Sequence, residues 1–207
     1  MPAQTDSYFY EPASGHGLPH DPFKAIVAPR PIGWIATRDR QGRANLAPYS
    51  FFNAFSSAPP IIGFSSEGHK DSVSNAEATG EFVANFVSRS LAEAMNRTSA
   101  PVGPEIDEMQ LAGLDAAPCR LVAAPRVAAA PAALECKLLQ VVRLRDLAGK
   151  ELESYLVLGQ VVGVHIDPRY LRDGRFDIAA AQPIMRTGYR ADYAEIGGIF
   201  EMFRPTS

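Results

Sequence analysis

The sequence predicts a mainly β protein with short helices, in which six or seven strands pair antiparallel. Short runs of β-branched, aromatic and aliphatic residues recur along the chain, and clusters of Gly, Pro and Asp separate them. The motifs GxGxxG, GxxxxGK(S/T) and GxSxG do not occur, and strands do not alternate regularly with helices. The pattern therefore disfavours a Rossmann domain, a P-loop NTPase and an α/β-hydrolase.

Length and composition are typical of one globular domain. The chain has 207 residues, of which 46% are apolar and 21% charged, and its formal net charge is −3. At roughly 150 residues per domain, a single domain is expected, and we assign it to residues 21–207. Residues 1–20 are rich in Pro, Gly, Ser and His without periodicity, so they predict an N-terminal arm. The negative charge disfavours nucleic acid as a partner.

The remaining general features predict a cytoplasmic protein without a metal. Cys119 and Cys136 fit neither a zinc nor a CxxC pattern, so we expect free thiols in a reducing compartment. The four histidines show no metal-ligand spacing. The N-terminus lacks the basic and apolar regions of a secretory signal. No apolar stretch approaches the about 18 residues of a membrane span, so no membrane partner is expected.

The N-terminal quarter of the domain predicts a short helix and a meander. Asp21 as N-cap and Pro22 at the first helical position indicate the helix. Residues 32–37 are apolar and β-compatible, a second extended run spans 46–55, and a third resumes at 61–64 after two prolines. Turn residues separate these runs, as in antiparallel strands.

Helices and a strand are expected in the middle of the chain. Residues 71–79 predict a helix that the following Gly ends. In the run at 82–86, the apolar residues Phe82, Ala84 and Phe86 alternate with polar neighbours, as in a strand with one buried face. Ser90 and Glu93 have the spacing of a capping box at the start of a second helix, and residues 107–114 predict a third.

The C-terminal half predicts a long hairpin after an unusual segment. Residues 116–133 hold nine Ala and three Pro, which we interpret as short extended pieces on a barrel edge, where Pro is tolerated. Residues 134–145 and 152–166 are dense in Val, Ile and Leu and flank a turn, so they predict two long paired strands. Residues 173–175 form a further turn signal, Asp-Gly-Arg.

One segment has the residues of a phosphate site. Ser65 and Ser66 end a predicted strand, and Lys70 immediately precedes a predicted helix. A helix N-terminus offers free N–H groups and about half a positive charge, which favour an anion. The alternative is that Asp71 or Ser72 merely caps this helix and that Lys70 is solvated.

Two further segments could meet a flat ligand. Residues 28–37 place Thr37 at the end of an apolar strand, and residues 45–53 mix aromatic side chains with hydroxyl and amide groups. Such a mixture suits a planar ligand with polar edges, although the aromatics alone could be core. His165 stands alone near the end of a long strand, where histidine is more often structural or superficial.

Together these segments resemble the flavin reductase-like family with the FMN-binding split-barrel fold. The resemblance rests on PRPIGWIAT (29–37), NLAPYSFFNA (45–54), KDSVSN (70–75), TGEFVAN (79–85) and PIMRTGY (183–189), among other runs. It extends from about residue 22 to residue 193. The motifs are individually weak, and their number and order carry the assignment.

The resemblance implies a six-stranded antiparallel Greek-key barrel that forms a homodimer with FMN, or FAD, at the subunit interface. The isoalloxazine and ribityl chain would be lined by Thr37, Pro48, Tyr49, Ser50, Phe51 and Phe52, and the phosphate would be held by Ser65, Ser66, Lys70 and Ser72. Two further residues, Asn53 and Tyr189, would lie near the flavin or the interface. His165 would lie near the nicotinamide or flavin ring.

The function that the resemblance implies is hydride transfer from NAD(P)H to flavin, with a partner oxygenase or electron-transfer protein as a further expectation. Two alternatives remain open. The chain could be an FMN electron-transfer protein, like flavoredoxin, that is reduced by a protein donor. It could also be a split-barrel module that binds another ligand, or none, and has no catalytic activity.

Overall fold

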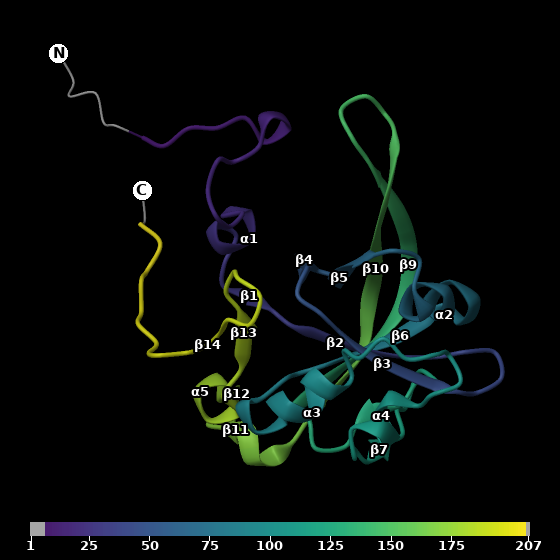
Figure 1. Cartoon of the computed structure of the whole chain (residues 1–207). Coiled ribbons are helices and arrows are strands. Elements are labelled where there is room, and N and C mark those ends of the chain that lie inside the picture. The colour runs from purple at the N-terminus through teal and green to yellow at the C-terminus, as the bar shows by residue number, and fades with distance from the viewer. Residues whose placement is uncertain (1–6, 206–207) are drawn as a thin grey trace.

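The computed structural model describes residues 7–205, and its centre is one curled antiparallel sheet (Figure 1). The sheet has seven strands in the order β3-β2-β6-β9-β10-β5-β4, one more than the six that the resemblance implies. The mainly β prediction is confirmed. The strands are β2 (Gly33–Arg38), β3 (Ala44–Tyr49), β4 (Phe52–Ser57), β5 (Pro60–Glu67), β6 (Glu81–Asn85), β9 (Ala132–Arg145) and β10 (Glu151–Ile166).

Smaller elements surround this sheet. A second sheet contains β1 (Arg30–Pro31), β13 (Ile184–Arg186) and β14 (Tyr193–Glu195), and two strand pairs are β7 (Ala116–Ala117) with β8 (Arg126–Val127) and β11 (Leu171–Arg172) with β12 (Arg175–Phe176). The helices are α1 (Phe23–Ile26), α2 (Asp71–Thr79), α3 (Ala92–Arg97), α4 (Glu108–Leu111) and α5 (Ile178–Ala181), with 3-10 turns η1 (Pro12–Ser14), η2 (Arg89–Leu91) and η3 (Pro168–Tyr170).

The two edge strands of the main sheet are neighbours in the sequence. β3 ends at Tyr49 and β4 begins at Phe52, so only Ser50 and Phe51 separate them. The sheet must therefore curl until its edges meet, and the Ser65 amide of β5 donates to the Phe51 carbonyl at 2.8 Å across this corner. Pro48 lies in β3, where the edge position spares it a ladder hydrogen bond. We call this region the corner.

Both faces of the central strands are buried. On β2, Trp34 packs into a cluster with Met95 of α3 and Met109 of α4, while Ile35 packs with Phe64 and Phe82 on the opposite face. Helix α2 adds apolar side chains to the second cluster. The helices and loops between β6 and β9 thus cover one face of the sheet, and α2 covers the other.

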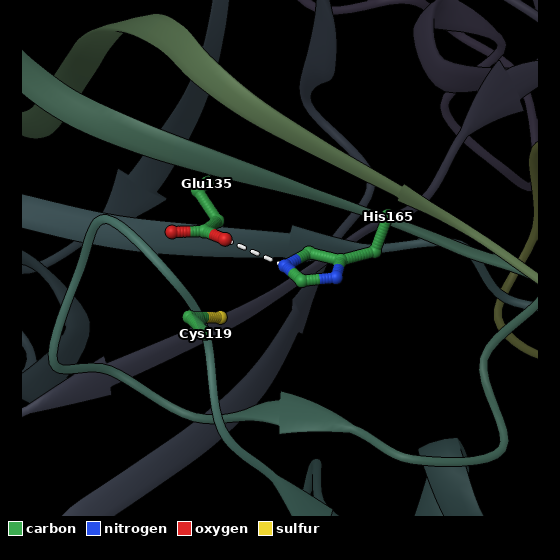
Figure 2. A group of neighbouring side chains, drawn as sticks. All are labelled: Cys119, Glu135 and His165. Carbon is green, nitrogen blue, oxygen red and sulfur yellow. Dashed lines mark hydrogen bonds and ion pairs between the residues drawn. The ribbon is translucent and has the colours of Figure 1, made fainter.

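The Ala- and Pro-rich loop before β9 is held by a buried glutamate (Figure 2). Glu135 is 1% exposed, and its carboxylate accepts hydrogen bonds from the amides of Arg120 (2.9 Å), Leu121 (2.6 Å) and Val122 (3.0 Å). His165 Nε2 lies 2.5 Å from the same carboxylate. Burial alone would raise the pKa of Glu135, but these hydrogen bonds outweigh it and lower the pKa below its usual value.

Two residues of β6 hold the same loop. Glu81 accepts from the Ala123 amide at 2.5 Å and pairs with Lys137 at 2.7 Å. Asn85 accepts from the Val127 amide at 2.8 Å. All five residues of β6 are buried, so the prediction of a half-buried strand is wrong. The loop covers the face of β6 that carries Glu81 and Asn85, because its backbone amides donate hydrogen bonds to these two side chains.

Other elements differ from their predictions in detail. The expected Ser90 capping box is absent: Ser90 Oγ lies 2.9 Å from Ser88 Oγ, and α3 begins at Ala92 without a side-chain cap. Helix α1 begins at Phe23, one residue after the predicted start, although Asp21 still accepts from the Phe23 amide at 2.9 Å.

Two extended segments are also arranged differently. The run at 46–55 is two strands, because the corner interrupts it. Within 116–133, β7 and β8 pair with each other and not with an edge of the main sheet.

Several predictions are confirmed. Helix α2 spans the predicted residues, and Gly80 ends it with a φ of 74°. The long hairpin is β9 and β10, which project together beyond the rest of the sheet (Figure 1). The helix predicted at 107–114 is present as α4, which is shorter than expected (Glu108–Leu111), and Asp107 caps it by accepting from the amides of Met109 and Gln110.

We expect Glu135→Gln to lower the free energy of unfolding by about 2–4 kcal/mol at neutral pH, because an amide replaces a buried carboxylate that accepts several hydrogen bonds. Urea unfolding followed by circular dichroism measures this loss. Glu153→Gln is the control, because its side chain is 70% exposed and its ion pair should contribute less than about 1 kcal/mol.

The same variant tests the direction of the pKa shift. A lowered pKa stabilises the folded state above the unfolded value of about 4.3 and ceases to do so as the pH falls toward the folded value. The stability difference between the parent and Glu135→Gln should therefore shrink between about pH 6 and pH 3. A difference that is constant over this range would contradict the assignment.

Candidate functional site

Two adjoining cavities lie along the corner. The larger has a volume of about 580 Å³ and is lined by Pro48 and Tyr49 of β3, by Lys70 and Ser72 at the start of α2, and by residues 98–102. The smaller, of about 160 Å³, shares Pro48 and Ser99 with it and is lined further by Ile32, Ser50, Met95, Arg186 and Tyr193. We call the two together the corner trough.

The N-terminus of α2 opens into the larger cavity without a side-chain cap. Lys70 occupies the N-cap position, and no side chain accepts a hydrogen bond from the first turn. The first amides of a helix have no acceptor within it. The alternative that Asp71 or Ser72 caps the helix is therefore wrong. Asp71 also lines the cavity, and its negative charge opposes that of an anion there.

Buried hydroxyl groups lie behind the trough. Thr37 Oγ1 accepts from Asn45 Nδ2 (3.3 Å) and Asn75 Nδ2 (3.2 Å), and Asn45 also donates to Ser72 Oγ at 3.0 Å. Ser66 Oγ donates to the Gly68 carbonyl at 2.8 Å. Thr37, Ser66 and Ser72 are almost completely buried. In this conformation they fix the relative positions of β2, β3, β5 and α2.

Burial shifts the pKa of two ionisable groups that line the larger cavity. Burial raises the pKa of Tyr49 above its usual value, against hydrogen bonding from Ser72 and Ser66. Burial also raises the pKa of Glu108, although its carboxylate accepts from the Leu46 amide at 2.9 Å. Tyr49 thus remains a protonated donor at neutral pH.

The trough brings together five of the residues that were predicted from the sequence: Pro48, Tyr49, Ser50, Lys70 and Ser72. Ser65 and Phe51 lie at the corner but do not line either cavity. Phe52 instead lines a separate apolar cavity of about 310 Å³. Asn53 is exposed, and its Oδ1 accepts from the Ala54 amide at 2.8 Å. Tyr189 is exposed, with its ring 5.9 Å from that of His20.

His165 is not brought to the trough within one chain. On β10, Tyr155 is the register neighbour of Ser66, and His165 lies ten residues further along the strand. At about 3.3 Å per residue this is roughly 30 Å. Its imidazole contacts Glu135, with 20% of the side chain exposed.

Cys119, Glu135 and His165 form the one group among the described residues whose ligand atoms are close enough for a metal, all within 4.8 Å of one another (Figure 2). Both oxygens of Glu135 are already hydrogen-bonded. Burial and the nearby Glu135 charge raise the pKa of the Cys119 thiol to about 11. A protonated thiol beside a saturated carboxylate is a poor ligand set, so the group is better explained as the support of the loop. Cys119 and Cys136 are both free.

Sequence reasoning did not single out Arg186, Tyr193 or Ser99. These residues reach the trough from β13, β14 and the segment after α3, which are far apart in the sequence. Arg186 belongs to the PIMRTGY run, so the sequence motif includes it but does not indicate which residues surround it in the fold. No helix within residues 7–205 has the length and apolar character needed to cross a bilayer.

Comparison with known proteins gives consistent matches. The family model for the flavin reductase like domain matches residues 27–179. An uncharacterised protein of Halalkalibacterium halodurans is 35% identical over 185 residues, which cover 87% of this chain and 88% of that protein. Among solved structures, nitrilotriacetate monooxygenase component B from Bacillus cereus has a TM-score of 0.81 and 30% identity, covering 87% of this chain and 90% of that one.

A third comparison extends the fold assignment. Flavoredoxin of Desulfovibrio vulgaris has a TM-score of 0.75 at 24% identity and covers 84% of this chain and 90% of its own, which shows a shared fold. The family model spans well over half of the described chain, and the relatives align along most of their length. The chain belongs to the flavin reductase-like family.

Proposed function

We propose that the chain binds FMN in the corner trough and that the bound flavin accepts a hydride from NAD(P)H. The observation that carries this proposal is the uncapped N-terminus of α2, which opens with Lys70 into a cavity of about 580 Å³. Ligand sites are typically about 300–1,000 Å³ in volume, so the trough has adequate room. The family supports flavin as the ligand.

The phosphate end of FMN fits the start of α2. Free amides and the helix dipole favour a dianion, and the Lys70 ammonium adds a charge-assisted hydrogen bond. Asp71 reduces this attraction, so Lys70 is needed to offset it. Thr37, Asn45 and Ser72 support the site from behind by fixing α2 against β3.

The ring end of FMN fits the smaller cavity. Its walls combine the apolar Pro48 and Ile32 with the Tyr193 ring and the Ser50 hydroxyl, which suits a flat ring with polar edges. The bound flavin supplies the redox chemistry at its ring, and the residues of the chain bind and orient it. No nucleophile or metal is required for this step. His165 has no role in this proposal, because its imidazole contacts Glu135.

We also propose that the protein is a homodimer with the flavin site near the interface. Large apolar side chains on the N-terminal arm, on α1 and on the C-terminal tail are exposed in the single chain: Phe9, Ile26, Phe200, Met202 and Phe203. Both segments extend away from the main sheet (Figure 1). A surface of this kind is expected to be covered by a second protein surface. A partner oxygenase is a further proposal, supported by the likeness to a monooxygenase component.

We expect Lys70→Ala to weaken FMN binding about tenfold or more and to leave riboflavin binding nearly unchanged, because the lost charge faces the phosphate. Quenching of flavin fluorescence during titration measures both affinities. Lys150→Ala is the matched control, because Lys150 lies at the exposed turn of the β9–β10 hairpin, remote from the trough. Equal FMN affinity in all three proteins would exclude Lys70 from the phosphate site.

Anaerobic addition of NADH, and separately NADPH, to the FMN-loaded protein should bleach the flavin absorption bands. Hydride transfer reduces the ring, and the faster nucleotide identifies the donor. Bands that persist with both nucleotides but disappear with dithionite would instead favour an electron-transfer protein reduced by another protein. A protein that takes up no flavin would contradict the whole proposal.

A further inference from the structure

Arg186 lines the smaller cavity of the trough, and Arg30 lies beside it in the neighbouring strand. Arg30 of β1 and Arg186 of β13 are register neighbours in an antiparallel pair, so their side chains lie on the same face of that small sheet. Like charges in this arrangement repel each other. Desolvation by burial lowers the pKa of Arg30, and the charge of Arg186 lowers it further.

Neither charge is neutralised by a carboxylate. Arg30 is 6% exposed; its Nη1 donates to the carbonyls of Lys24 and Val27, and its buried Nε has no hydrogen-bond partner. Within residues 7–205, no ion pair involves Arg30 or Arg186. The nearby Glu67 pairs with Lys24 instead. The charge of Arg30 is buried without a counter-charge, which is costly, and an anion bound at Arg186 would reduce that cost.

Arg186 is held in place before any ligand arrives. Its guanidinium lies 4.7 Å from the centre of the Tyr193 ring, and its Nη2 donates to the carbonyls of Tyr189 and Arg190, both at 3.3 Å. A planar guanidinium stacked on an aromatic ring loses little further freedom on binding. Both Arg186 and Tyr193 line the smaller corner cavity.

Arg30 does not line the smaller cavity and lies behind it, next to Arg186 and the corner. Its guanidinium lies 5.8 Å from the centre of the Phe51 ring, and Phe51 follows Ser50, which lines the smaller cavity with Arg186. The trough therefore has a cation at each end: Lys70 lines the larger cavity, and Arg186, with Arg30 behind it, lines the smaller one.

We propose that Arg186, reinforced by Arg30, stabilises the negative charge that the flavin ring gains on reduction. This inference rests on the proposed function. Transfer of a hydride from a dihydronicotinamide to a bound flavin would give the flavin ring one negative charge and would turn the donor into a cation. No further proton or reagent is needed. A fixed cation at the place where charge develops favours the reduced state selectively.

The test is the midpoint potential of bound flavin in the parent, Arg186→Gln and Arg186→Lys. We expect Arg186→Gln to weaken binding of reduced FMN about tenfold more than binding of oxidised FMN, which lowers a two-electron potential by about 30 mV. Arg186→Lys keeps the charge and should restore most of the difference. Arg190→Gln is the matched control, because Arg190 lies on the same turn but does not line the smaller cavity.

Riboflavin separates a charge on the ring from a charge on the phosphate. If Arg186 acts on the ring, Arg186→Gln shifts the potential of bound riboflavin as much as that of bound FMN. A shift seen with FMN alone would mean that Arg186 binds the phosphate and would overturn the inference. An unchanged potential in a variant that still binds FMN would also overturn it and leave the proposed function intact.

A protein that binds no flavin would overturn both the inference and the proposed function. If Arg186→Gln does not fold, Tyr193→Leu is the second variant, because it removes the ring that holds Arg186. It should lower the potential in the same direction by a smaller amount, and a potential equal to that of the parent would count against the inference.

Discussion

Because β3 ends at Tyr49 and β4 begins at Phe52, the first and last strands of the seven-stranded sheet can lie only about 10 Å apart along the connecting chain. A flat sheet with this strand order would separate its edges by several strand spacings of about 4.8 Å each. The sheet must curl, and the corner at Ser50 and Phe51 is where the curl closes. The trough, its cations and its buried hydroxyls all lie around this corner.

In a curled sheet whose edges nearly meet, some backbone amides have no neighbouring strand to accept their hydrogen bonds. Side-chain carboxylates accept these hydrogen bonds instead. On the edge strand β3, Glu108 accepts from the Leu46 amide, where a further strand would otherwise pair. On β6 and β9, Glu81 and Glu135 bind the amides of a loop that contains almost no regular structure. The chain thus uses buried carboxylates as substitutes for ladder hydrogen bonds, which accounts for glutamates in strands that are buried on both faces.

The sequence predicted those elements that depend on interactions between residues close together in the chain. Helix α2 and the β9–β10 hairpin depend on spacing and turn residues that lie within a few positions of one another. The phosphate site proposed at Lys70 was predicted in the same way, since the argument for it needs only a strand end and a helix start. The prediction for β6 failed because a loop more than 30 residues later covers its polar face.

The arginine pair could not be found by the same reasoning. Arg30 and Arg186 meet only because β1 and β13 pair across more than 150 residues of sequence. The absence of a counter-charge for them within residues 7–205 is likewise a property of the folded chain. When a site is assembled from segments far apart in the chain, a single sequence contains no local pattern that indicates it.

The two cationic ends of the trough would act differently on a bound flavin. The phosphate carries the same charge whether the ring is oxidised or reduced, so Lys70 would stabilise both states equally and change only affinity. The ring changes its charge during the reaction, so the arginine pair would stabilise one state more than the other and change the reduction potential. Separate cavities for the two ends would allow different residues to set the affinity for the cofactor and its reduction potential. The corner would provide this separation, because β3 contributes Tyr49 to the larger cavity and Pro48 to both.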